Sequence, residues 1–206
     1  MLQTLADQAV KSGEALEVSA KTLSIRLLVL NFASIYPSFA TVWNTVLALA
    51  ASSPDKGFID GIREEIERVK GDGTDAWTGE ELDQLWRLDS AIKESMRTWM
   101  PLASGMIRTV RILRLYLVTR LTYFFVQVSS PSGYTLPDGI HLNQGAMVGL
   151  PMHSIHHDPN FYPHPEKYDA FRFSKMREKS NGGKEHALTS ISRPEFMAFG
   201  LGIHAW

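Results

Sequence analysis

The stretch Ile92-Lys93-Glu94-Ser95-Met96-Arg97 decides how the rest of the sequence is interpreted. Glu94 and Arg97 lie three positions apart, so on an α-helix they share one face. Core-type residues, Ile92 and Met96, flank the pair, which indicates partial burial rather than an exposed ion pair worth under ~1 kcal/mol. A buried pair needs further hydrogen bonds to offset its desolvation, so we expect a third partner from elsewhere in the chain.

Helical patterns surround this stretch. Thr78 precedes two acids and is typical of an N-terminal cap, and an apolar stripe continues to Pro101, so we predict one helix over 80–100. Apolar spacing between Phe58 and Lys70 predicts a second amphipathic helix.

The run from Leu27 to Ser53 contains no charged residue and is long enough to cross a bilayer. Polar residues recur through it and Pro37 lies at its middle, which favours a core helix kinked at the proline. A membrane span remains the alternative.

The composition narrows the classes of function. The 206 residues carry a net charge of −1, which provides no global attraction to nucleic acid, and the basic stretch between Glu94 and Asp138 has no recognisable nucleic-acid module around it. No cysteine is present, which excludes disulfides, zinc ribbons and thiolate ligands.

The later part of the chain combines turns with a glycine-rich ending. Residues 110–128 are rich in β-branched and aromatic side chains, and Leu136-Pro137-Asp138-Gly139 predicts a turn between two short strands. His156-His157-Asp158 lacks the spacing of a metal motif, so a turn or helix-start role for Asp158 is favoured. For His204, beyond the Gly200-Leu201-Gly202 loop, a core position, a contact with an anionic ligand and a tail position all remain open.

Three motifs, taken in order, resemble the C-terminal half of a cytochrome P-450 of the fungal microsomal type, a haem-thiolate monooxygenase. Lys93 to Arg97 resembles the ExxR of the K helix, and Tyr168-Asp169-Ala170-Phe171-Arg172-Phe173 resembles the PERF segment. The segment from Phe199 to Ala205 resembles the haem-binding loop F-G-x-G-x-H-x-C.

The resemblance implies a mainly α fold with a small β component (α+β), a partial P-450 fold from the I helix to the start of the haem-binding loop. The implied partial domain extends over 1–206. Residues 23–51 then correspond to the I helix, 58–70 to the J helix, 80–100 to the K helix, and 156–206 to the meander and a truncated haem loop.

The resemblance also implies roles for individual residues. Glu94, Arg97 and Arg172 form a structural network that locks the haem loop. The implied haem contacts are Arg108, Phe199, Gly200, Gly202 and His204, with Arg108 and His204 neutralising the propionates. The implied wall of the substrate pocket is Pro101, Leu102, Ala103, Ser104, Gly105 and Met106.

The implied chemistry is haem-dependent O₂ activation and hydroxylation of a C–H bond in an apolar substrate, for example in secondary metabolism. The resemblance further implies that electrons come indirectly from NADPH through a cytochrome P-450 reductase. It also implies a location at the endoplasmic reticulum membrane, with the anchor absent from this chain.

Several positions depart from the family. Trp206 stands where the axial cysteine belongs, and an indole has no lone pair with which to bind iron. Pro37 stands at the oxygen-groove threonine, leaving Ser38 as the nearest hydroxyl. Residues 111–127 are an extra segment, which we interpret as translated intron sequence. We therefore expect a truncated and inactive chain, with no metal ligand.

Two non-enzymatic interpretations remain beside it. One is a small membrane-associated or interaction protein that uses the apolar run 27–53. The other is a regulatory fragment that binds haem weakly through His204.

Overall fold

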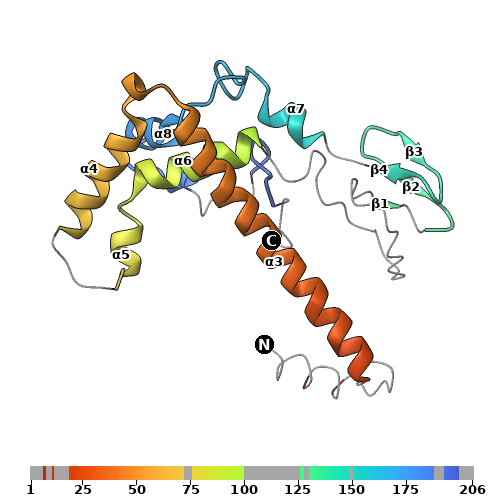
Figure 1. Ribbon diagram of the computed structural model, residues 1–206. Helices are drawn as coiled ribbons and strands as arrows, with labels where there is room; N and C mark the ends of the chain where they lie inside the picture. The colour runs from red at the N-terminus through yellow and green to blue at the C-terminus, as the bar shows by residue number, and fades with distance from the viewer. Residues whose placement is uncertain are drawn as a thin grey trace. The chain divides into compact units, whose positions relative to one another are not determined.

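The computed structural model describes residues 7, 11, 19–71, 76–99, 126–127, 130–148, 151–187 and 193–199. The chain divides into two compact units, Met1–Trp43 and Asn44–Trp206, and the boundary falls inside one long helix. Most of the described structure is helical, with two small antiparallel sheets, so the predicted α+β class is confirmed (Figure 1).

Helix α3 spans Ala20–Ala51 and contains the uncharged run. The helix continues through Pro37, and the Ser38 hydroxyl donates to the carbonyl oxygen of Ser34 at 2.8 Å. The helix predicted over 23–51 is thus confirmed and begins three residues earlier. Its predicted burial is wrong for the described residues, because only Thr45 and Ala48 of α3 are buried.

Helix α4 spans Phe58–Lys70, the bounds that were predicted, and follows the short 3₁₀ helix η1 (Pro54–Lys56). Its length is set locally, since glycines with positive φ flank it at Gly57 and Gly71. Phe58 and Ile62 pack with Ala91 and Ala170, which joins α4 to the rest of the C-terminal unit.

The single helix predicted over 80–100 is wrong, because the chain forms α5 (Gly79–Leu82) and then α6 (Trp86–Thr98). The predicted cap at Thr78 is confirmed, and its hydroxyl accepts the N–H of Glu81 at 3.2 Å. The break follows from a distant residue: the buried carboxylate of Glu65 in α4 accepts the N–H of Arg87 at 2.9 Å and that of Leu88 at 3.1 Å. These bonds give acceptors to two N–H groups in the first turn of α6, which have no partner within the helix.

Two hairpin-like pairs follow. Strand β1 (Val126–Gln127) pairs with β4 (Met147–Val148), and β2 (Tyr134–Thr135) pairs with β3 (His141–Leu142). The predicted turn is confirmed, since the N–H of Gly139 donates to the oxygen of Leu136 at 2.9 Å and Gly139 has φ +90°. Of the segment 111–127, the structure describes β1 alone.

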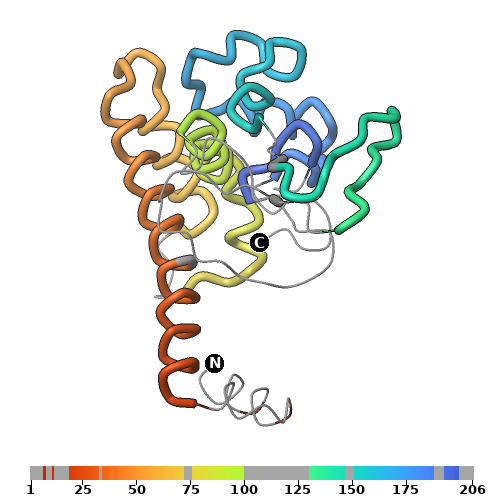
Figure 2. The backbone as a smooth tube through the Cα atoms, turned by 90° about the vertical axis from the view of Figure 1, so that its right-hand side faces the viewer, coloured from red at the N-terminus to blue at the C-terminus, as the bar shows by residue number. Residues whose placement is uncertain are grey.

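Helices α7 (Met152–His156) and α8 (Arg172–Lys179) and the 3₁₀ helix η2 (Lys184–His186) complete the described structure. Residues 152–187 lie beside α6 in both views (Figures 1 and 2). The core they share is Met96, Tyr162, Phe173, Phe196 and Ala198. This core packs the loop after α7, helix α8 and segment 193–199 against Met96 of α6.

Candidate functional site: a buried Glu–Arg–Arg network

Glu94 and Arg97 form the predicted ion pair on α6, with relative exposures of 0% and 1%. The guanidinium of Arg97 binds the carboxylate with two nitrogens, Nε and Nη2, each 2.8 Å from an oxygen. Arg172, the first residue of α8, donates from Nε to both oxygens of Glu94 at 3.1 Å. The expected third partner is therefore found, and it is the predicted Arg172.

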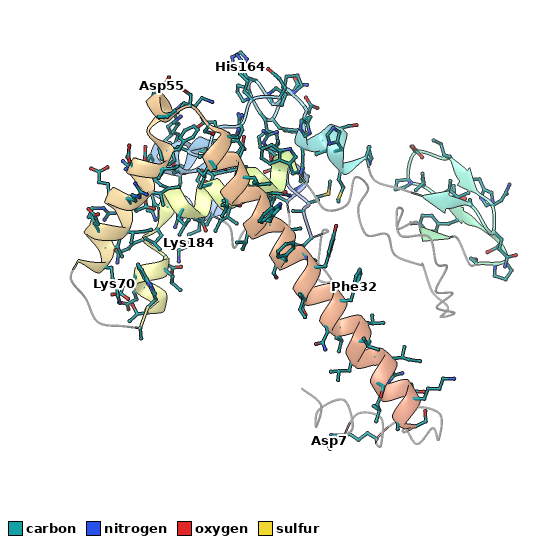
Figure 3. The ribbon with its side chains drawn as sticks, viewed as in Figure 1. Asp7, Phe32, Asp55, Lys70, His164 and Lys184 are labelled. Atoms are coloured by element: carbon teal, nitrogen blue, oxygen red, sulfur yellow. The ribbon has the colours of Figure 1, made fainter. Side chains whose placement is uncertain are left out.

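The two guanidinium groups also hold the loop between α7 and α8, in which His164 is labelled in Figure 3. The carbonyl acceptors are those of His156 and Pro165 for Arg97, at 2.7 and 2.8 Å, and those of Pro163 and Lys167 for Arg172, at 2.7 and 2.9 Å. One carboxylate against two guanidinium groups leaves an excess positive charge. The carbonyl dipoles offset it, which makes burial of the trio tolerable.

Tyr162 connects this network to the next segment of chain. Its ring lies against the guanidinium of Arg97 at 5.2 Å, and its hydroxyl donates to the carbonyl oxygen of Glu195 at 2.8 Å. Burial raises the pKa of the Tyr162 hydroxyl well above its usual range, so the group stays protonated and remains a donor.

Segment 193–199, which leads toward the glycine-rich sequence, is packed around Phe196. The ring of His156 stacks on that of Phe196 with centroids 4.9 Å apart, and the ring of Phe173 meets it edge-on at 5.7 Å. The buried ammonium of Lys93 lies 4.8 Å from the Phe196 centroid and donates to the oxygen of Ala187 at 2.8 Å. Desolvation lowers the pKa of Lys93 to about 8.

Sequence reasoning missed the roles of His156 and Lys93. For the lysine, a signal was its position between Ile92 of the apolar stripe and Glu94, whose burial was expected. The turn role of Asp158 is confirmed, since its carboxylate accepts the N–H of Asn160 at 2.8 Å. No sequence signal separates the buried His156 from its half-buried neighbour His157.

The other predicted site residues are only partly within the described structure. Phe199 is described and packs against the core of Phe196. Ser38 belongs to the N-terminal unit, where its hydroxyl is bonded within its own helix. The predicted residues outside the described ranges are Pro101, Leu102, Ala103, Ser104, Gly105, Met106, Arg108, Gly200, Gly202, His204 and Trp206.

The α+β fold and the buried Glu94–Arg97–Arg172 network agree with the family that the three sequence motifs resemble. The chain belongs to the cytochrome P-450 family, whose model, described as Cytochrome P450, matches residues 1–205.

Among fungal relatives, the chain is 31% identical to cytochrome P-450 monooxygenase okaG of Penicillium ochrochloron, over 98% of this chain and 38% of that protein. It is 32% identical to monooxygenase gloP of Glarea lozoyensis, over 100% of this chain and 36% of the relative. A zebra fish cytochrome P-450, in a structure with abiraterone, shares the fold with a TM-score of 0.67 at 16% identity, over 100% of this chain and 40% of that one. The chain therefore spans less than half the length of these proteins.

The family implies a haem cofactor, but the donor set of this chain does not fit a haem-thiolate. The 206 residues include no cysteine, and the residue at the motif's cysteine position is Trp206. Indole nitrogen donates a proton and has no lone pair for iron. A sulfur ligand of the kind that defines the class is not available from these residues.

Proposed function

We propose that this chain performs the structural task of the C-terminal part of a cytochrome P-450 monooxygenase, which is to hold the segment that leads to the iron-binding loop. One observation carries the proposal: Glu94, Arg97 and Arg172 are buried together and hold the loop between α7 and α8, from which Tyr162 reaches segment 193–199 at the carbonyl oxygen of Glu195. All six guanidinium nitrogens donate to protein acceptors, so the loop is held by a rigid, fully bonded network.

The activity we assign to the whole enzyme is haem-dependent monooxygenation of a small apolar substrate. The fungal relatives are named as cytochrome P-450 monooxygenases, which supports this class of reaction. The supply of electrons from NADPH through a cytochrome P-450 reductase, and a location at the endoplasmic reticulum membrane, follow from the microsomal resemblance.

The polypeptide with Trp206 at the cysteine position of the motif does not carry out this chemistry itself. A haem-thiolate requires a sulfur ligand, and the indole of Trp206 supplies none.

An absorption spectrum of the reduced protein with carbon monoxide tests this assignment. The parent chain, supplied with haemin, should show no thiolate-type Soret band. Trp206→Cys should bind ferric haem more tightly than the matched control Trp206→Ser, because a thiolate is an iron ligand and a hydroxyl is a poor one. A thiolate-type band from the parent chain contradicts the assignment of inactivity.

A second function, that of a membrane-associated or interaction protein, is favoured by α3. Among the described residues, α3 is the one helix that is long and apolar enough to cross a membrane, judged by length and composition. Phe32, labelled in Figure 3, is one of its exposed apolar side chains. Carbonate extraction separates the two functions, because a spanning helix keeps the chain in the membrane pellet and a core helix releases it.

A further inference from the structure

We infer that His156 is a positioning residue that ties the Glu–Arg–Arg network to segment 193–199. It is the last residue of α7 and is fully buried. Its carbonyl oxygen accepts Nη1–H of Arg97 at 2.7 Å. Its ring nitrogen Nε2 accepts the backbone N–H of Met197 at 3.0 Å. His156 therefore bonds to the Glu–Arg–Arg network through its main chain and to segment 193–199 through its side chain.

The ring is held in the orientation that this second bond needs. The imidazole and the ring of Phe196 lie 14° from parallel, so the stacking fixes the plane of the imidazole. The lone pair of Nε2 lies in that plane and points at the N–H of Met197. Met197 is 4% exposed, and a buried backbone N–H left without an acceptor is costly.

The bond requires one particular form of the ring. Since Nε2 accepts, the proton of the neutral imidazole is on Nδ1. Desolvation, helped by the nearby charge of Arg97, lowers the pKa of His156 to about 4, and His153 and His157 act in the same direction. The ring is thus neutral at physiological pH, as an acceptor must be.

Neighbouring contacts show what His156 adds. Tyr162 holds Glu195 by its carbonyl oxygen, and Lys93 lies over the ring of Phe196. His156 holds the next residue, Met197, by its N–H, so three successive residues are held from three different positions. The inference concerns backbone order and does not depend on the haem proposal.

Two substitutions separate the hydrogen bond from simple packing. His156→Phe keeps an aromatic ring against Phe196 and removes the acceptor, whereas His156→Gln places an amide oxygen near the position of Nε2. The full chain is labelled with ¹⁵N-methionine and the exchange of the Met197 amide is measured, with Met176 of α8 as the internal reference. We expect roughly tenfold or faster exchange of Met197 in His156→Phe, and recovery in His156→Gln.

Unchanged protection of Met197 in His156→Phe overturns the inference, and so does failure of His156→Gln to restore protection while Met176 keeps its own. If either variant does not fold, the inference is tested on the parent chain instead. Its imidazole ¹⁵N spectrum should show Nδ1 protonated, with scalar coupling between Nε2 and the Met197 amide nitrogen. A protonated Nε2 overturns the inference, and neither result bears on the haem spectrum.

Discussion

Helices α6 and α3 differ in burial, and the difference is the opposite of what their hydropathy predicts: the more polar helix is the buried one. Helix α6 buries three charged side chains, Lys93, Glu94 and Arg97. Helix α3 has an uncharged middle and buries only Thr45 and Ala48 among its described residues. The difference teaches that burial follows available partners, because α7, α8 and the loop between them supply acceptors and rings to α6.

The comparison also separates two kinds of energetic cost. The charges of α6 are stable only while each donor has its acceptor, so single substitutions there leave a buried charge unpaired. Most of the large apolar side chains of α3 are exposed to begin with, so replacing those side chains changes little in the folded chain itself. Exposed apolar surface of this extent is typical of a face that contacts lipid or another protein segment.

The largest effect is expected for Glu94→Gln, which leaves two buried guanidinium groups without a carboxylate. We expect a loss of about 3–5 kcal/mol in the free energy of unfolding, measured by urea denaturation followed by circular dichroism. Glu64→Gln is the matched control, because the Glu64 side chain is 76% exposed and its pair with Arg87 contributes at most about 1 kcal/mol. Equal losses in the two variants would show that the network is not buried.

Arg97→Lys keeps the charge and removes the planar fork. The lysine cannot bind the carboxylate with two nitrogens and also reach the carbonyls of His156 and Pro165, so we expect a loss of about 2–3 kcal/mol in the same titration. The exposed residue Arg63 provides the control, and Arg63→Lys should change stability by under about 0.5 kcal/mol. An unchanged free energy of unfolding in Arg97→Lys would mean that the positive charge alone holds the loop between α7 and α8.

The free energy of unfolding should depend on pH through the protonation of the buried His156. The pKa of His156 falls from 6.5 to about 4 on folding, so the unfolded chain takes up the proton first as the pH falls. The neutral ring of His156 therefore contributes fully to the free energy of unfolding above pH 6.5, and this contribution is lost toward pH 4. About 2 kcal/mol is lost between pH 6.5 and pH 5. Urea titrations at several pH values should show a shallower dependence in His156→Gln. Identical slopes would place a protonated or exposed histidine at this position.

The smallest effect on stability is expected on α3. Phe32 and Phe39 are 58% and 62% exposed, so replacing both by serine should change the free energy of unfolding by under about 0.5 kcal/mol. The same variant should bind less to lipid vesicles and self-associate less in sedimentation. A loss of stability comparable to that of Glu94→Gln would show that this face is covered in the folded chain.

Local patterns explain which parts of the fold were predictable. Helix α4 was predicted with its bounds because its apolar spacing and flanking glycines act within a few residues. The break before α6 was not predictable, because the carboxylate of Glu65 that caps α6 is 22 and 23 residues from the amides that it accepts. The membership of Arg172 in the network came from the burial argument together with the family resemblance. The burial expected for α3 was wrong, since hydropathy alone does not specify a partner.

The order of the motifs, the cap at Thr78, the turn at Gly139 and the indole at position 206 follow from residue identity, because each is a property of a few neighbouring residues. The tertiary structure alone decided that His156 accepts the N–H of Met197 and that Lys93 lies over the ring of Phe196. Hydrogen bonds and ring contacts act over only a few ångströms, so their partners are defined after distant segments have packed together.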